Sequence, residues 1–308
     1  MRYIEKRNER MDHNLQKYIT FVKTVELGSF TKAAAVLNYT QSSVSKMIAD
    51  LEREWQVALL QRDRNGVTLT AAGERLLPYA RLLLEDYRKI EGCVDELHGL
   101  QTGKIRIGTF ASVAIHWLPN IIAHFQKDYP GIEYEMLLGD YEEVTRWIDE
   151  GRVDCGFLRL PTKPEFDTIS IKKDEYVVVL PKGHPLAKKK KIPIETLEGE
   201  PFMLLEHGGR TEVSELLEQY QVHPQIRFTT WEDYAILAMV EKGFGIGILP
   251  RLILQRIPYE VEIRPLQEPY FREIGVAMKN RERVTPVTER FFSYLHFMED
   301  TDAEHQNK

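Results

Sequence analysis

Two short amphipathic segments with only a brief turn between them occupy residues 29–55, SFTKAAAVLNYTQSSVSKMIADLEREW. Ser29 or Thr31 can cap the first segment as a helix and Thr40 can cap the second, because hydroxyl side chains accept hydrogen bonds from a first helical turn. The alanines of TKAAAVL let a neighbouring helix approach closely. The stretch is therefore either a helical corner packed for its own sake or a corner that presents its second helix to a partner.

The second helix, from Gln41 to about Trp55, has two distinct faces when residues are placed ~100° apart. Its apolar face consists of Val44, Met47, Ile48, Leu51 and Trp55. The opposite face holds Ser42, Lys46, Ala49 and Arg53, flanked by Gln41 and Ser45, and its leading turn lacks acids. A helix that enters the DNA major groove needs short polar groups at its leading end and a cation, although an ordinary solvated helix face has the same composition.

The flanking segments favour DNA binding over a merely solvated helix. Before the two helices, apolar residues from Leu15 to Val25 recur at helical spacing. After them, ALLQRDRNGVTLT carries the RNG turn signal of a β-hairpin, with Arg62 and Arg64 at or beside the tip. A wing that lies on DNA phosphates would place its basic residues there.

Residues 21–77 resemble the winged helix-turn-helix of the LysR-type transcriptional regulators. The matching pieces are GSF at 28–30, AA at 33–34, TQS at 40–42, VS at 44–45, LE at 51–52, LLQR at 59–62 and LTAAG at 69–73. Ser42 stands where proline is common in that family, and Lys46 where arginine is common. Because lysine cannot form a planar two-pronged contact, we expect an operator preference that differs from that of arginine-bearing relatives.

The resemblance implies a winged helix-turn-helix domain over residues 12–70. It assigns base contacts to Gln41, Ser42, Ser45 and Lys46. Phosphate contacts, which set affinity and salt dependence, are expected from Thr31, Arg53, Arg62 and Arg64.

Residues 71–100 form a long amphipathic segment that Gly99 and Gly103 end. Its apolar positions Leu76, Ala80, Leu83, Tyr87, Ile90, Val94 and Leu97 step alternately by four and three residues, which is a heptad seam. Leu77 and Leu84 widen the stripe, so a helix lying on its own domain is an alternative, and Pro78 is a site for a kink. The resemblance favours a linker helix that pairs with its copy, and it implies a dimer or a dimer of dimers.

The remaining segment, residues 104–300, alternates strands and helices. KIRIGTF, EYEMLLGD and VDCGFLR read as strands separated by the helices ASVAIHWLPNIIAHFQKDYPGI and YEEVTRWIDEG. The pattern restarts with YVVVLP and ends with the strand REIGVAMK and a closing helix. This order predicts a two-lobed α/β effector domain, with one lobe over 104–163 and 268–300 and the other over 164–267.

Ligands of such sheets bind at the carboxyl ends of strands, beside helix N-termini. The candidate effector-binding residues at such places are Thr109, Ser112, Gly139, Asp140, Arg159, Glu206, Thr230 and Trp231. This half resembles the LysR-type effector domain, which is similar to periplasmic solute-binding proteins. That resemblance implies a small-molecule effector in a cleft between the lobes, often an anion or a carboxylate.

The sequence offers little support for other kinds of site. GFGIG follows a helix rather than a strand, so it is no dinucleotide fingerprint, and KKKK at 188–191 suits a solvated turn. The histidines show no metal-ligand spacing, and no nucleophile with its base can be assembled, so we expect no metal, no cofactor and no catalytic residue. The first ten residues lack the apolar core of a secretory signal, and Met11 stands as an alternative start.

The bulk composition agrees with a DNA-binding head on an acidic body. Residues 1–70 hold eleven Lys and Arg against eight Asp and Glu, whereas the whole chain carries a net charge of −6. No apolar run spans a membrane, and two distant cysteines, Cys93 and Cys155, indicate a reduced cytoplasmic protein.

We therefore expect a LysR-type regulator that is not an enzyme and binds inverted-repeat operators in double-stranded DNA under control of a small effector. RNA polymerase is a further candidate partner. Two alternatives stay open: a small-molecule binding protein whose helix-turn-helix contacts only a partner, and an enzyme domain fused to a DNA-binding head.

Overall fold

The computed structural model describes residues 13–63, 66–206 and 211–299. The chain divides into two compact units between Val94 and Asp95. Within the described residues, no helix is both long enough and apolar enough to cross a membrane.

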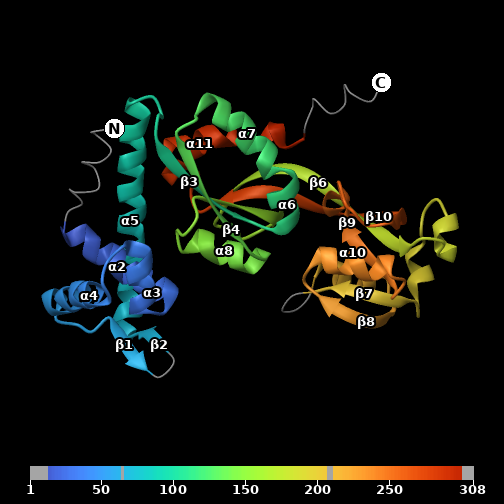
Figure 1. Ribbon diagram of the computed structural model, residues 1–308, viewed down its shortest axis with the longest axis horizontal. Helices are drawn as coiled ribbons and strands as arrows, with labels where there is room; N and C mark the ends of the chain where they lie inside the picture. Colours follow the sequence, from blue (N-terminus) through green and yellow to red (C-terminus); the bar gives the residue numbers. More distant parts are fainter. Residues whose placement is uncertain (1–12, 64–65, 207–210, 300–308) are drawn as a thin grey trace. The chain divides into compact units, whose positions relative to one another are not determined.

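The first unit is a group of helices with a small hairpin. It comprises α2 (His13–Leu27), α3 (Phe30–Leu37), α4 (Gln41–Trp55), the strands β1 (Leu60–Asp63) and β2 (Gly66–Leu69), and most of α5 (Ala71–Leu97). Figure 1 shows α2, α3 and α4 packed together, with the β1–β2 hairpin beside the start of α5. Ser29 caps α3 and Thr40 caps α4, as the sequence predicts, because each hydroxyl accepts a backbone N–H of the first turn.

The inward face of α4 anchors this unit. Val44 and Ile48 are buried with Phe30, Ala33 and Ala34 of α3, and Leu51 is buried with Phe21 of α2 and Leu59. The predicted apolar face is confirmed for Val44, Ile48 and Leu51, whereas Met47 and Trp55 are only half-buried. The small Ala33 and Ala34 side chains let α3 lie close to α4, which is why the sequence places alanines there.

Hydrogen bonds donated by backbone N–H groups tie the hairpin to the helices. A carboxylate oxygen of Glu52 in α4 accepts from Leu59 N at 2.7 Å and from Leu60 N at 3.1 Å. The carbonyl of Gly28, between α2 and α3, accepts from Val67 N of β2 at 3.1 Å. The wing therefore takes its position from α4 and from the turn that precedes α3.

Helix α5 runs without a break through Pro78. Leu77, Ala80 and Leu84 are buried in the core of the first unit, with Leu76 and Tyr87 packed against it. Exposed apolar side chains follow another line, which we call the exposed α5 face: Tyr79, Leu83, Ile90, Val94 and Leu97. The predicted heptad seam is thus divided, because its members Leu76, Ala80 and Tyr87 serve the unit's own core while the others face outward.

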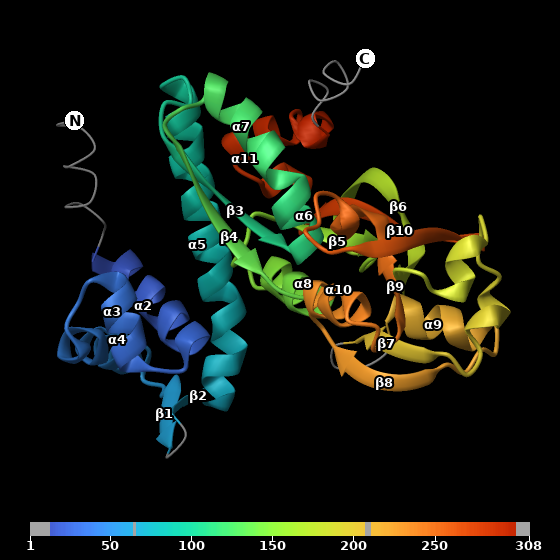
Figure 2. The same ribbon diagram turned by 45° about the vertical axis from the view of Figure 1, so that its right-hand side comes forward.

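The second unit is built on one eight-stranded sheet with the order β4-β3-β5-β10-β6-β9-β7-β8. Its strands are β3 (Gly103–Thr109), β4 (Ile132–Leu138), β5 (Cys155–Leu160), β6 (Asp167–Pro181), β7 (Pro201–Leu205), β8 (Gln225–Thr230), β9 (Ile246–Pro250) and β10 (Val261–Met278). Strand β3 pairs in parallel with β4 and β5, and β7 pairs in parallel with β8 and β9. The two long strands β6 and β10 are antiparallel and join the parallel groups into two lobes (Figure 2).

Helices cover the sheet in both lobes. They are α6 (Ala111–His116), α7 (Leu118–Asp128), α8 (Tyr141–Asp149), α9 (Glu212–Gln219), α10 (Asp233–Glu241) and α11 (Pro286–Phe292). The single helix expected over residues 111–132 is broken at Trp117, whose backbone ends α6 and begins α7. Short 3-10 turns complete the unit: η1 (Pro185–Lys188), η2 (Ile194–Leu197), η3 (Arg251–Leu254), η4 (Arg281–Arg283) and η5 (Leu295–Met298).

The crossover between the lobes lies within β6 and β10. Ile169 and Ile171 of β6 pack against the core of the first lobe, whereas Tyr176, Val178 and Leu180 belong to a core of the second. The expected lobe boundary at residue 164 therefore falls before the crossover, which is near Asp174. The early part of β6 and the first half of β10 were absent from the sequence-based strands, because their polar residues interrupt the apolar pattern. The short apolar strand β7, PFMLL, was also absent from them.

Gly73, in the first turn of α5, tests how tightly the wing is held. A Cβ atom there would lie 2.1 Å from the carbonyl oxygen of Leu59, which is the group that accepts from Thr70 N. We expect Gly73→Ala to destabilise the first unit by about 1–3 kcal/mol, as overpacking does. Hydrogen exchange of residues 13–70 in the full chain would measure this, with exposed Arg75→Ala as the control. Equal protection in both variants would contradict the prediction.

Candidate nucleic-acid interface and effector site

The leading end of α4 presents polar side chains to solvent. Gln41, Ser42 and Lys46 are exposed, and Ser45 is half-buried. The first turn contains no acidic residue. The Thr40 hydroxyl lies 2.8 Å from the hydroxyls of both Ser42 and Ser43, so the capping residue also orders the hydroxyls of this turn.

The four residues expected to contact phosphates differ in their exposure and in their ion pairs. Thr31 is exposed near the start of α3. Arg53 is exposed but forms an ion pair with Asp50 one turn earlier, so a neighbouring carboxylate partly offsets its charge. Arg62 belongs to β1, but its side chain and all of Arg64 lie outside the described residues.

A buried ion pair lies at the crossover of the second unit. Arg272 of β10 and Asp174 of β6 face each other directly in the antiparallel register. The Asp174 Oδ2 atom accepts from Arg272 Nε at 2.9 Å and from Nη2 at 2.8 Å, and Asp174 Oδ1 accepts from Leu252 N at 2.9 Å. Arg272 is only 6% exposed and Asp174 only 7%. Such a pair needs further hydrogen bonds to offset the cost of its burial.

Residues of the first lobe supply those bonds. Arg272 Nη2 donates to the Ser112 hydroxyl at 2.9 Å, and Nη1 donates to the Tyr141 hydroxyl at 3.1 Å. The guanidinium carbon also lies 5.0 Å from the centre of the Phe110 ring. One arginine therefore joins both crossing strands to the start of α6 and the start of α8.

The surroundings keep Arg272 charged. Burial acts to lower the pKa of Arg272, but Tyr141, Tyr176 and Asp174 outweigh it and raise this pKa well above its usual value. For Tyr141, burial has the opposite effect and raises the pKa, although the Arg272 charge opposes that shift. Tyr141 therefore remains a neutral hydroxyl that accepts from Arg272 and lies beside the Glu212 carboxylate.

A second set of charges joins the lobes beside this pair. Arg159, at the end of β5, donates from Nη2 to Glu215 at 3.1 Å, and its Nε lies 3.9 Å from Glu212 Oε1. Both acids belong to the first turns of α9 in the second lobe. We call Ser112, Tyr141, Asp174, Glu212 and Arg272 the junction cluster, since they meet where the lobes join.

Two buried carboxylate oxygens of this region accept no hydrogen bond from the described residues, Glu212 Oε1 and Asp233 Oδ1. Glu212 is 8% exposed. Burial raises the pKa of Asp233 to about 6, while the Arg272 charge acts in the opposite direction and Glu232 and Asp174 add to the rise.

The predicted effector residues are not all in this region. Ser112 belongs to the junction cluster, Arg159 lies beside it, and Thr109 is fully buried. Asp140 caps α8 by accepting from Glu143 N, and Gly139 has no room for a side chain because a Cβ would lie 2.6 Å from Trp147. These two positions therefore have structural roles in the loop that leads to α8.

The remaining three predicted residues lie at the end of the β7–β8 pair. Glu206 N donates to Thr230 O at 2.9 Å, and the Thr230 hydroxyl accepts from Glu232 N. Trp231 is 66% exposed. No hydrogen bond or ion pair found among the described residues joins these three side chains to Ser112, so their part in ligand binding stays a prediction.

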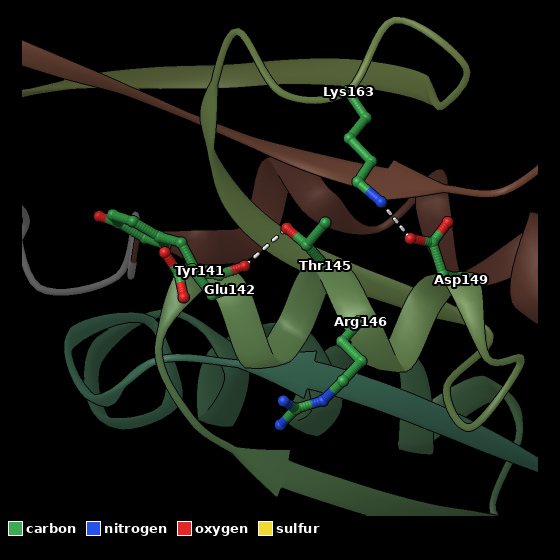
Figure 3. Close-up of a pocket in the computed structure, with 6 residues that line it drawn as sticks. All are labelled: Tyr141, Glu142, Thr145, Arg146, Asp149 and Lys163. Atoms are coloured by element: carbon green, nitrogen blue, oxygen red, sulfur yellow. Dashed lines mark hydrogen bonds and ion pairs between the residues drawn. The ribbon is translucent and has the colours of Figure 1, made fainter. Parts of the chain in front are cut away.

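A hollow of about 430 Å³ lies along α8. Figure 3 shows Tyr141 at one end of this helix and the Lys163–Asp149 ion pair at the other, with Glu142, Thr145 and Arg146 between them. Tyr141 is shared by the hollow and the junction cluster. The described residues include no group of three side chains suited to hold a metal ion.

Sequence reasoning missed Asp174, Glu212, Asp233, Tyr141 and Arg272. Each stands next to the start or end of a predicted strand or helix, which was the available signal. Arg272 and Asp174 are 98 residues apart, so only the strand register shows that they meet.

Asp233 gives a prediction about pH. Its carboxyl has an ordinary pKa of 3.8 and a folded pKa of about 6, so ionisation costs folding free energy fully above pH 6 and not at all well below 3.8. We expect Asp233→Asn to raise the Tm above pH 6 and to lose this gain as the pH falls through that window. Thermal unfolding of the full chain across this range would measure it, with exposed Glu142→Gln as the control. A gain that does not vary with pH would contradict the assignment.

Comparison with protein families agrees with the division of the chain. Residues 15–74 match the family described as bacterial regulatory helix-turn-helix protein, lysR family. Residues 98–297 match the family described as LysR substrate binding domain.

Individual proteins extend this agreement over nearly the whole chain. A probable HTH-type transcriptional regulator, LrrA of Synechococcus elongatus, is 36% identical over 293 residues, which covers 94% of this chain and 98% of LrrA. A full-length OxyR variant from Pseudomonas aeruginosa has a TM-score of 0.72 at 20% identity, covering 94% of this chain and 95% of that chain. Full-length CbnR in complex with its target DNA has a TM-score of 0.63 at 20% identity, covering 92% and 99%.

The two low-identity structures show a shared fold, and the family matches and LrrA carry the assignment. This family consists of transcriptional regulators rather than enzymes, which decides against an enzyme fused to a DNA-binding head. With its helix-turn-helix head and its two-lobed α/β domain, the chain belongs to the LysR family of transcriptional regulators.

Proposed function

We propose that this regulator binds inverted-repeat operators in double-stranded DNA and that a small effector in the second unit controls the binding. The observation that carries the proposal is the exposed, acid-free leading end of α4, held by a buried face of Val44, Ile48 and Leu51. CbnR, which shares the fold, is found in complex with its target DNA. A DNA target also agrees with the expected cytoplasmic location.

Base and phosphate contacts divide along α4 and the wing. Gln41, Ser42 and Lys46 are exposed at or near the leading end, where a recognition helix meets base edges, and Ser45 lies between them. Thr31, Arg53, Arg62 and Arg64 are proposed to contact phosphates. Because Arg53 already pairs with Asp50, we expect it to contribute less than an unpaired arginine.

The exposed α5 face supports self-association. Leu83 is 42% exposed, Ile90 62% and Leu97 85%, and their spacing suits a second helix. Two heads joined in this way read two half-sites roughly 34–36 Å apart or a multiple of that distance. A dimer of dimers follows from the family resemblance, and RNA polymerase is proposed as the partner through which operator binding affects transcription.

Effector control is proposed to act through the lobe junction. Arg272 and Asp174 lie on the two strands that cross between lobes, and Ser112 and Tyr141 bind Arg272 from the first lobe. A ligand that binds one arrangement of the lobes better than another shifts the population toward it. That shift would change how the paired heads bind the operator.

Footprinting on the DNA upstream of the chain's own coding region tests the proposed function. We expect protected half-sites in inverted orientation at low salt. An absence of protection at low salt would reject DNA regulation and favour a binding protein whose helix-turn-helix contacts only a protein partner.

Lys46 and Arg64 should separate specificity from affinity. We expect Lys46→Ala to lower the preference for operator over random DNA by about tenfold, because it removes a base contact. We expect Arg64→Ala to weaken binding to both DNAs alike and to reduce the salt slope by about one. Titrations at several salt concentrations measure both effects. The opposite pattern would reverse the division of base and phosphate contacts.

Leu83→Glu with Ile90→Glu should break the dimer, because four carboxylates would meet across the paired exposed α5 faces. We expect monomers in sedimentation experiments and loss of tight operator binding. Arg75→Glu, an exposed change earlier on α5 and outside this face, serves as the control. An intact dimer in the double variant would show that another surface joins the subunits.

A further inference from the structure

Glu52 carries its charge at a place where a carboxylate is unfavourable. It lies in the last turn of α4, where the helix dipole disfavours negative charge, and in a domain that binds the phosphates of DNA. Among the residues that the structure describes, no lysine or arginine pairs with Glu52, although Lys17 pairs with the neighbouring Glu54 at 3.0 Å. A role for the Glu52 carboxylate must therefore come from the groups that it does bind.

Those groups are two consecutive backbone N–H groups at the start of the wing. Glu52 Oε1 accepts from Leu59 N at 2.7 Å and from Leu60 N at 3.1 Å. Hydrogen bonds to a carboxylate are stronger than those to a neutral acceptor. The Leu59 side chain is fully buried, and the Leu59 carbonyl accepts from Thr70 N at 3.0 Å. The backbone that leads into β1 is thus held by α4 through its N–H groups and by the residue before α5 through its carbonyl.

This contact also sets the distance between the two proposed kinds of DNA contact. Lys46 precedes Glu52 by six residues, which is roughly 9 Å along a helix. Arg62 follows Leu60 by two residues, which is roughly 7 Å along a strand, and Arg64 is two residues further in the sequence. A movement of β1 away from Glu52 would therefore shift the proposed phosphate contacts of the wing and leave the proposed base contacts of α4 in place.

We propose that Glu52 is a positioning residue for DNA binding, whose carboxylate holds the start of β1 so that the wing reaches the phosphates beside the bases that α4 contacts. This inference rests on the proposed DNA contacts and assigns a role to a residue outside them. The reach of the side chain is decisive rather than its charge, because one oxygen has to accept from two N–H groups at once.

Two substitutions in the full chain separate reach from charge. Glu52→Gln keeps the length and an acceptor oxygen but removes the charge, whereas Glu52→Asp keeps the charge but is one methylene shorter. We expect Glu52→Asp to weaken binding to operator and to random DNA by the same factor, about tenfold, and to lower the salt slope by about one to two. Glu52→Gln should keep the slope of the unchanged protein, as should the matched control Glu54→Gln, whose side chain is exposed.

The salt slope distinguishes positioning from a general loss of stability. A smaller folded fraction lowers the apparent affinity by a similar factor at each salt concentration and leaves the slope unchanged, so an unchanged slope for Glu52→Asp would overturn the proposal. A slope lowered equally by Glu52→Gln would overturn it as well, because the charge would then be decisive. So would a loss of operator preference in Glu52→Asp, which would place the effect of Glu52 on the base contacts.

Hydroxyl-radical footprinting shows where on the operator the contacts are lost. We expect the unchanged protein to protect the backbone within and beside each half-site, and Glu52→Asp to lose protection only beside it. Full protection by Glu52→Asp would reject the role of Glu52 and leave DNA regulation standing. An absence of any protection by the unchanged protein at low salt would instead reject the proposed function, and this inference with it.

Discussion

The buried pair of Arg272 and Asp174 is the interaction on which the second unit depends. Each residue lies on a strand that crosses between the lobes, and together they engage the start of α6, the start of α8 and the backbone of η3. Removal of one partner would leave a buried charge without compensation, which typically costs about 3–5 kcal/mol.

In the first unit, too, a single side chain connects separate elements. Glu52 lies on α4 and yet accepts from two backbone N–H groups that lead into β1, so one side chain connects the recognition helix with the wing. The polar leading end of α4 and the wing are thus held in a fixed arrangement. The exposed ends of Gln41, Ser42 and Lys46 stay available because the helix is fixed from its opposite face.

Much of this fold could be predicted, because the spacing of apolar residues along the sequence indicates which side chains are buried. The positions of Val44, Ile48 and Leu51 follow from helical spacing, and the alternation of strands and helices indicates the α/β domain. The full β10 could not be predicted, since charged and proline residues interrupt it. Periodicity also could not predict how the α5 seam divides. Helical spacing shows that a residue is apolar on one face, but it does not show whether the unit's own core or a second chain covers that residue.

By itself the sequence determined the family, the helix-turn-helix with its outward polar face, and the two-lobed α/β body, because these follow from local spacing and short motifs. Only the tertiary structure decided that Ser112 accepts a hydrogen bond from Arg272 and that Asp174 forms an ion pair with this arginine. It also decided that Glu212 and Glu215 of α9 lie beside Arg159 of β5. The physical reason is strand register: residues 98 apart become neighbours only when β6 and β10 pair, and no local pattern encodes that pairing.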